Sequence, residues 1–201
     1  MNIAVLMLVV GEFEGAELSV ASAQAYCTRH GYDLIVNREL IREEVSPNWN
    51  KILWLKAVLP QYDAVLLLDA DTMCAGQDIP LEPFLSDGIT ASRISEGADK
   101  FCYGVVLFRN TAAVIELIDN VLTEPDAFLY LAGRQESEPF NRLLAKEGAP
   151  PVNRLPRHIF NAMYFRPFGY LKTNVTPETV FVHWAGGLKK DGAGGLMKEF
   201  S

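Results

Sequence analysis

The sequence predicts an α/β fold in which helices flank a mostly parallel central sheet. Residues 64–68 carry the main indication, because five apolar residues without a polar break are too few for a free-standing helix and are typical of a strand buried on both faces. A strand, a helix and a second strand also follow one another at the amino terminus. With 201 residues, 49% of them apolar, the chain is expected to form one domain, residues 1–201, with a sizeable core.

The amino-terminal elements form a β-α-β unit in this interpretation. Residues 3–10 are expected to be the first strand, which Gly11 ends. Residues 16–30 are rich in alanine and predict a helix, and Gly31 follows where a left-handed C-cap residue is needed. Residues 32–36 then complete the unit as its second strand.

Glu12 and Phe13 follow the first predicted strand. The carboxylate offers a hydrogen-bond acceptor and the phenyl ring a stacking face, so a nucleotide base could bind there. A loop phenylalanine that only covers the core would give the same pattern. Both interpretations remain open at this point.

The rest of the chain continues to alternate helices and strands. Ile52, Leu55 and Leu59 recur at the spacing of one helix face and predict a helix over residues 49–59, which Pro60 ends. The later elements expected are an amphipathic turn at residues 79–85, strands at 88–92, 103–108 and 180–182, helices at 112–122 and 136–145, and a packed loop at 149–170. Residues 190–201 are expected to form a flexible tail because glycine recurs at their start.

Two carboxylates, Asp69 and Asp71, stand where the buried strand should emerge from the sheet. Open α/β sheets place their ligands at this position. Carboxylates two residues apart at a strand end can both turn toward one divalent cation, which needs anionic oxygens from a ligand to complete its shell. This is the geometry of a metal-bound diphosphate, although aspartates are common in turns and D-x-D alone often arises by chance.

Two further polar stretches are expected at the same edge of the sheet, the helix start at residues 136–141 and residues 183–189. His183 follows an apolar strand and precedes glycines that permit close backbone approach. Two aspartates and an imidazole form a mixed oxygen and nitrogen set that suits Mn²⁺ better than Mg²⁺, with Mg²⁺ still possible. Lys189 lies close enough in sequence to meet a phosphate, so that it and the metal would neutralise a departing diphosphate.

Four stretches in this order resemble GT-A glycosyltransferases. They are Trp49-Asn-Lys51, Tyr62-Asp-Ala-Val-Leu-Leu-Leu-Asp69-Ala-Asp71, Gly104-Val-Val-Leu-Phe-Arg109-Asn110 and His183-Trp-Ala-Gly186-Gly-Leu-Lys189. The nearest are the retaining families of glycogenin and bacterial lipopolysaccharide galactosyltransferases, and of the fungal and plant galactosyl-, mannosyl- and xylosyltransferases. The ordered set, which ends in H-x-x-G-x-x-K, is more specific than D-x-D alone. It implies a single Rossmann-like GT-A domain.

The resemblance also implies roles for individual residues. Asp69, Asp71 and His183 would hold the metal, and Lys189 would meet the diphosphate. Lys51 matches a family lysine on the donor side, and the other candidate donor-binding residues are Ala70, Asn141 and Gly186. Glu12, Phe13 and Arg93 are added from their positions after predicted strands, where Arg93 could reach a ligand or be a surface arginine. The candidate catalytic carboxylates are Glu136 and Glu138, in a stretch that resembles an acidic D-Q-D-x-x-N sequence contacting the donor sugar. The chain departs from the family pattern at Cys102, where asparagine is usual, and at Ser137, where glutamine is usual.

The predicted function is a metal-dependent retaining glycosyltransferase. It would move a hexose or pentose from a nucleotide diphosphate sugar, UDP-linked in this interpretation, to a glycan or another hydroxyl acceptor. One alternative is a non-catalytic nucleotide-sugar-binding protein, which the residues at positions 102 and 137 would suit. Another is a phosphatase of the haloacid-dehalogenase type, but that class uses D-x-D-x-[TV] on its first strand, whereas Met73 is the fifth residue here and two strands come earlier.

The composition limits the partners and the compartment. A net charge of −7 argues against a nucleic-acid surface, which would need clustered lysine and arginine. The three cysteines, Cys27, Cys74 and Cys102, favour neither a disulfide framework nor a structural zinc site, so a cytoplasmic protein is expected. Residues 1–10 are apolar but far shorter than the ~20 residues of a membrane span, and no span is expected.

Overall fold

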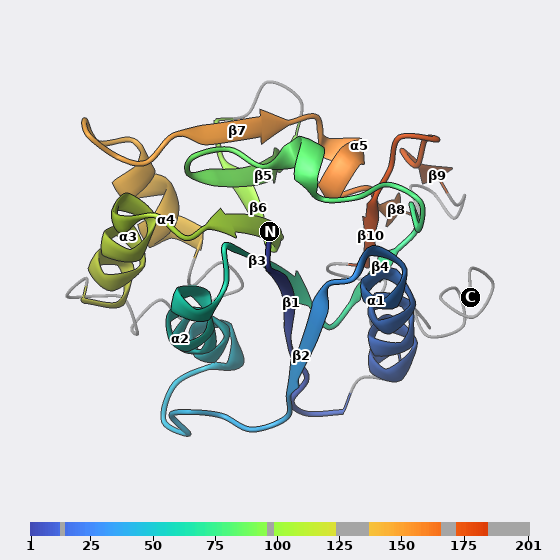
Figure 1. Cartoon of the computed structure of the whole chain (residues 1–201), viewed down its shortest axis with the longest axis horizontal. Helices are drawn as coiled ribbons and strands as arrows, with labels where there is room; N and C mark the ends of the chain where they lie inside the picture. Colours follow the sequence, from blue (N-terminus) through green and yellow to red (C-terminus); the bar gives the residue numbers. More distant parts are fainter. Residues whose placement is uncertain (13–14, 96–98, 124–136, 166–171, 185–201) are drawn as a thin grey trace.

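The structure is a computed structural model that describes residues 1–12, 15–95, 99–123, 137–165 and 172–184. Its centre is a six-stranded sheet in the order β2-β1-β3-β6-β5-β7. The strands are β1 (Ile3–Leu8), β2 (Asp33–Asn37), β3 (Ala64–Asp69), β5 (Ile89–Arg93), β6 (Phe101–Arg109) and β7 (Val152–Leu155). Helices lie on both faces of this sheet (Figure 1), which confirms the predicted α/β class.

Within this sheet, β6 runs against the other strands. β1 pairs in parallel with β2 and β3, and β5 pairs in parallel with β7. β6 pairs antiparallel with β3 and with β5. The carboxyl ends of β1, β3 and β5 therefore lie at the same edge as the first residues of β6, and we call this the site edge.

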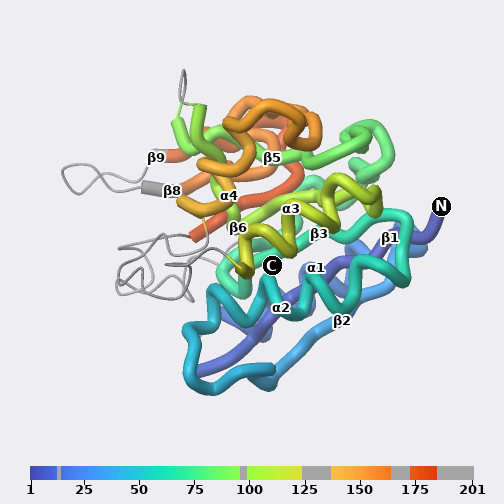
Figure 2. Tube along the Cα trace, turned by 90° about the vertical axis from the view of Figure 1, so that its left-hand side faces the viewer, coloured from blue at the N-terminus to red at the C-terminus, as the bar shows by residue number. Residues whose placement is uncertain are grey.

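The helices divide between the two faces of the sheet. α2 (Pro47–Val58), α3 (Ala112–Thr123) and α4 (Ser137–Leu144) cover one face, and α1 (Ala16–His30) and α5 (Arg157–Phe160) cover the other (Figures 1 and 2). Trp49, Leu55 and Phe140 belong to the core on the first face. Tyr26 and Phe160 belong to the core on the second. The strand β3 between them is buried on both sides, as its apolar run predicted.

Two short strand pairs lie outside this sheet. β4 (Thr72–Cys74) pairs antiparallel with β10 (Phe181–His183), and β8 (Tyr164–Phe165) pairs with β9 (Lys172–Thr173). Single 3-10 turns form η1 (Leu59–Gln61) and η2 (Glu82–Phe84). The β4–β10 pair joins the segment after β3 to the segment that carries His183.

The amino-terminal half follows the sequence expectations closely. α1 spans the predicted residues, and Gly31 has φ of 72°, the left-handed conformation expected of a C-cap glycine. α2 begins earlier than predicted, at Pro47, because the fixed φ of proline suits the first helical turn. It ends at Val58, and Pro60 lies in the 3-10 turn that follows.

The prediction of a packed loop over residues 149–170 is wrong for its described part. Residues 152–155 form the edge strand β7 in parallel register with β5, and residues 157–160 form α5. The strand Val-Asn-Arg-Leu is only four residues long, so its apolar pattern is weak and pairing with β5 decides its conformation. The short strand β4 was also not predicted.

Two further sequence predictions concern the carboxyl-terminal tail and the absence of a membrane span. The tail expected at residues 190–201 lies outside the described residues. No helix in the described ranges has both the length and the apolar character needed to cross a membrane.

Candidate metal and donor site

Asp69, Asp71 and His183 meet at the site edge. Asp69 is the last residue of β3, and Asp71 immediately precedes β4. His183 is the last residue of β10 and lies opposite Thr72 in the β4–β10 pair. The N–H of Trp184 donates to the carbonyl oxygen of Asp71 at 2.9 Å. Backbone pairing thus places the imidazole beside both carboxylates.

The geometry of these three side chains fits a divalent cation. Nε2 of His183 lies 3.3 Å from Oδ1 of Asp71 and 4.0 Å from Oδ2 of Asp69. The potential ligand atoms all lie within 4.8 Å of one another. Two ligand atoms that each lie about 2.1 Å from one metal ion are about 3 to 4 Å apart. Small movements of the three side chains would therefore bring their ligand atoms onto one cation.

Lys51, on α2, is tied to the same cluster. It is buried, and its Nζ donates to Oδ1 of Asp69 at 2.9 Å and to the carbonyl oxygen of Tyr103 at 3.2 Å. A buried ammonium group is tolerated when it is paired in this way. Lys51 therefore engages one oxygen of Asp69, while the other oxygen faces His183.

The imidazole of His183 lies in a narrow slot. A Cβ atom at Gly104 would lie 2.4 Å from Cε1 of His183, so the ring packs directly against the β6 backbone. On the Nδ1 side, Sγ of Cys102 is 3.6 Å away and Oδ1 of Asn161 is 3.0 Å away. The sequence drew attention to Gly104 and Cys102 but gave no signal for Asn161.

The surroundings of His183 shift its pKa. Burial by itself lowers the pKa, because it disfavours the charged imidazolium. Hydrogen bonds to Asp71 and Cys102 act in the opposite direction and hold the pKa well above its usual range. Without a cation, Asp71 and Cys102 thus favour a proton on the imidazole.

A cleft of about 150 Å³ adjoins the carboxylates. It extends from them to the end of β1 and the start of α2, and it is lined by Leu8, Val10, Pro47, Asn48, Lys51, Leu68, Asp69, Ala70 and Asp71. Glu12 is exposed and lies two residues after Val10, which lines this cleft, and Phe13 lies outside the described residues. The sequence identified Lys51 in this wall but not Leu8, Val10, Pro47 and Asn48.

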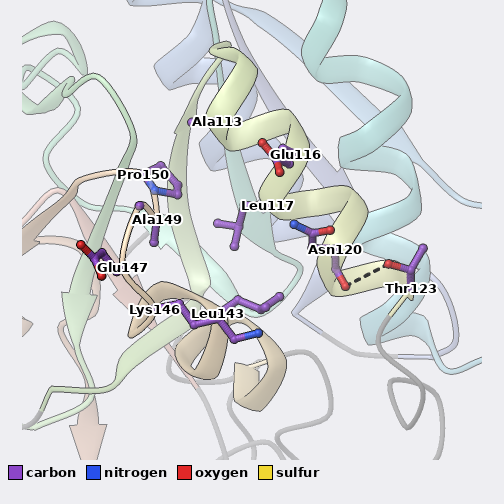
Figure 3. A pocket seen from close by; sticks show the side chains of 11 residues that line it. Ala113, Glu116, Leu117, Asn120, Thr123, Leu143, Lys146, Glu147, Ala149 and Pro150 are labelled. Carbon is purple, nitrogen blue, oxygen red and sulfur yellow. Dashed lines mark hydrogen bonds between the residues drawn. The ribbon is translucent and has the colours of Figure 1, made fainter.

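A larger cavity, of about 400 Å³, lies between α3 and the connection from α4 to β7 (Figure 3). Its wall includes Glu116, Asn120, Lys146 and Glu147. None of the predicted site residues lines it. Size alone therefore does not identify the site, and the cleft beside the carboxylates is the candidate.

The other predicted site residues have the following positions. Arg93 ends β5, opposite Phe101 at the start of β6. Oδ1 of Asn141 accepts a hydrogen bond from the Phe101 N–H at 3.2 Å, and its Nδ2 donates to the carbonyl oxygen of Ser137. The carboxylate oxygens of Glu138 lie 2.8 and 3.1 Å from Nζ of Lys100. The candidates outside the described residues are Phe13, Glu136, Gly186 and Lys189.

Comparison of this chain with solved structures identifies its fold. No protein-family model and no curated protein matches the chain. A glycosyltransferase involved in glycosylating the major capsid of the virus PBCV-1 superposes with a TM-score of 0.69 at 13% identity, covering 99% of this chain and 100% of that one. The galactosyltransferase LgtC, bound to donor and acceptor sugar analogs, has a TM-score of 0.54 at 16% identity over 98% of this chain and 94% of that one.

A third similar structure is a variant of Drosophila β1,4-galactosyltransferase 7, in complex with manganese, UDP-Gal and xylobiose. Its TM-score is 0.54 at 16% identity, over 94% of this chain and 74% of that one. The chain therefore has the GT-A fold of these glycosyltransferases, as the ordered sequence motifs predicted.

Proposed function

We propose that this chain, which has a glycosyltransferase fold, is a metal-dependent glycosyltransferase that uses a UDP-linked sugar as donor and a glycan or other hydroxyl compound as acceptor. The observation that carries the proposal is the meeting of Asp69, Asp71 and His183 beside a cleft at the site edge. Open α/β sheets bind their ligands at this edge. The manganese and UDP-Gal bound to the similar Drosophila enzyme agree with this type of donor.

The three side chains would hold Mn²⁺, or Mg²⁺ as the alternative. Two carboxylates and an imidazole form a mixed oxygen and nitrogen set, which favours Mn²⁺ of the two. The bound cation would supply positive charge to the departing diphosphate. Lys51 keeps Asp69 oriented for this task through its 2.9 Å ion pair.

The cleft is suited to the nucleotide part of the donor. Its far end is formed by Leu8 and Val10 of the β1 end and by Pro47 and Asn48 of α2. Apolar side chains with a few polar groups are typical of small-molecule sites. We propose that the nucleoside lies at this end, next to Glu12, and that the diphosphate points toward Asp69 and Asp71.

We propose that the transfer retains the configuration of the sugar, as the ordered motifs imply. Glu138, the described candidate for a covalent nucleophile, has its carboxylate in an ion pair with Lys100. Attack of the acceptor from the side of the leaving group therefore suits this chain better than a covalent intermediate on Glu138. Glu136 lies outside the described residues.

A donor screen tests the proposed function. UDP-sugars are added to the protein with and without Mn²⁺, and the melting temperature and UDP release are measured on the same samples. A donor at about 100 times its Kd should stabilise the fold by about 2.7 kcal/mol, and only with the metal. Binding without UDP release would favour the non-catalytic alternative. No Mn²⁺-dependent shift with any nucleotide sugar would contradict the proposal.

The raised pKa of His183 predicts how metal affinity depends on pH. Without metal, the protonated imidazole stabilises the fold fully below its usual pKa of 6.5 and loses this effect as the pH rises through the higher folded value. A cation on Nε2 must displace this proton, so the affinity for Mn²⁺ should rise up to about tenfold per pH unit below the folded pKa. Calorimetric titrations from about pH 6 to 8 measure this slope, and the His183→Ala variant should show a flatter one.

A further inference from the structure

The two ring nitrogens of His183 face different surroundings. Nε2 faces the carboxylates of Asp69 and Asp71 at 4.0 and 3.3 Å. Nδ1 lies 3.0 Å from Oδ1 of Asn161 and 3.6 Å from Sγ of Cys102. A neutral imidazole carries one proton, so the partner of Nδ1 decides which nitrogen has a lone pair for a cation.

The backbone holds Asn161 beside this ring. The N–H of Ala162 donates to the carbonyl oxygen of Phe181 at 3.2 Å, and the N–H of His183 donates to that of Ala162 at 2.8 Å. The N–H of Asn161 donates to the carbonyl oxygen of Arg157 at 3.0 Å. Backbone hydrogen bonds thus fix Asn161 and the residue that follows it, and the Asn161 side chain is buried beside the imidazole.

The chemistry of the amide oxygen selects one tautomer. Oδ1 of Asn161 only accepts hydrogen bonds, so a neutral His183 in contact with it carries its proton on Nδ1. The lone pair then lies on Nε2, which faces the carboxylates. The sulfur of Cys102 is farther from Nδ1 and is a weaker acceptor, so it does not replace the amide.

We propose that Asn161 is a positioning residue that acts through His183 to prepare the site for a divalent cation. It fixes both the tautomer and the orientation of the ring, as the outer hydrogen-bond partner of a metal-ligating histidine does. This proposal rests on the metal-dependent function proposed above. It adds a residue from the connection between β7 and β8, where the sequence indicated only a loop.

Mn²⁺ titrations of metal-free protein, followed by the EPR signal of the free ion, test this role. Asn161→Leu removes the acceptor at nearly constant volume and should weaken Mn²⁺ binding by about 10- to 100-fold. Asn161→Asp keeps an acceptor oxygen beside Nδ1 and should bind Mn²⁺ at least as tightly as the wild type. Asn153→Leu is the matched control. Asn153 lies in β7 and donates a hydrogen bond to the carbonyl oxygen of Phe84 in η2, so its replacement should leave the Mn²⁺ affinity unchanged.

A double-mutant cycle separates positioning from a general structural role. In the His183→Ala background, Asn161→Leu should not weaken Mn²⁺ binding further, because Asn161 affects the metal only through its hydrogen bond to the imidazole. Additive losses, or wild-type affinity in Asn161→Leu, would overturn the proposal. If Asn161→Leu does not fold, a loss of Mn²⁺ affinity in folded Asn161→Asp would overturn it instead. If His183→Ala alone binds Mn²⁺ normally, the metal site itself is wrong and this proposal falls with it.

Discussion

If the proposed function is correct, Asp71→Ala is expected to reduce Mn²⁺-dependent UDP release from the donor nucleotide sugar strongly. Asp71 is buried beside His183, with 3.3 Å between Oδ1 and Nε2. Without this carboxylate, the remaining ligands are the imidazole and Asp69, which is paired with Lys51. Charge stabilisation by a bound metal contributes several kcal/mol, so the rate should fall by about 100-fold or more. Calorimetry measures the loss of Mn²⁺ affinity, and an assay of UDP release measures the loss of rate.

Asp87→Ala is the matched control for this variant. Asp87 is exposed and lies two residues before the strand β5, at the edge of the sheet opposite the site edge. Its removal also takes away one carboxylate, so the net charge of the two variants is the same. Asp87→Ala should keep the Mn²⁺ affinity and turnover of the wild type. Equal UDP release from Asp71→Ala and Asp87→Ala would exclude the proposed metal-dependent reaction.

Gly104→Ala is expected to displace the imidazole of His183 and to destabilise the fold. Gly104 lies in the strand β6, and an added Cβ would lie 2.4 Å from Cε1, 2.9 Å from Nδ1 and 3.0 Å from Nε2 of His183. The ring cannot move away without losing its contacts to Asn161 and Asp71. Overpacking of this kind costs about 1 to 3 kcal/mol. Chemical denaturation and Mn²⁺ titration should show lower stability together with a loss of metal affinity.

The His183→Ala background identifies the cause of that destabilisation. Removing the ring leaves space for the new methyl group, so Gly104→Ala should then cost little further stability. The coupling between the two substitutions should therefore approach the full cost of Gly104→Ala in the wild type, about 1 to 3 kcal/mol. Strictly additive effects would show that the methyl group clashes with something other than the imidazole.

The sequence predicted those parts of the fold whose signals are local. The apolar run of β3 and the left-handed Gly31 after α1 each depend on a few neighbouring residues, and the structure has both as expected. The meeting of Asp71 and His183 was predicted from a general rule about sheet edges, together with the order of the motifs. In contrast, β7 is short and polar, and it forms a strand because β5 is available for pairing.

The sequence by itself determined the class of fold, most of its helices and strands, and the polar residues that could form a site at one edge of the sheet. Only the tertiary structure decided that Gly104 forms the floor beneath His183, that Asn161 faces Nδ1, and that the start of α2 lines the cleft. The physical reason is the sequence separation of the residues that interact. Helix and strand signals act between residues a few positions apart, whereas these contacts join distant segments whose separation is set by strand order, strand direction and register.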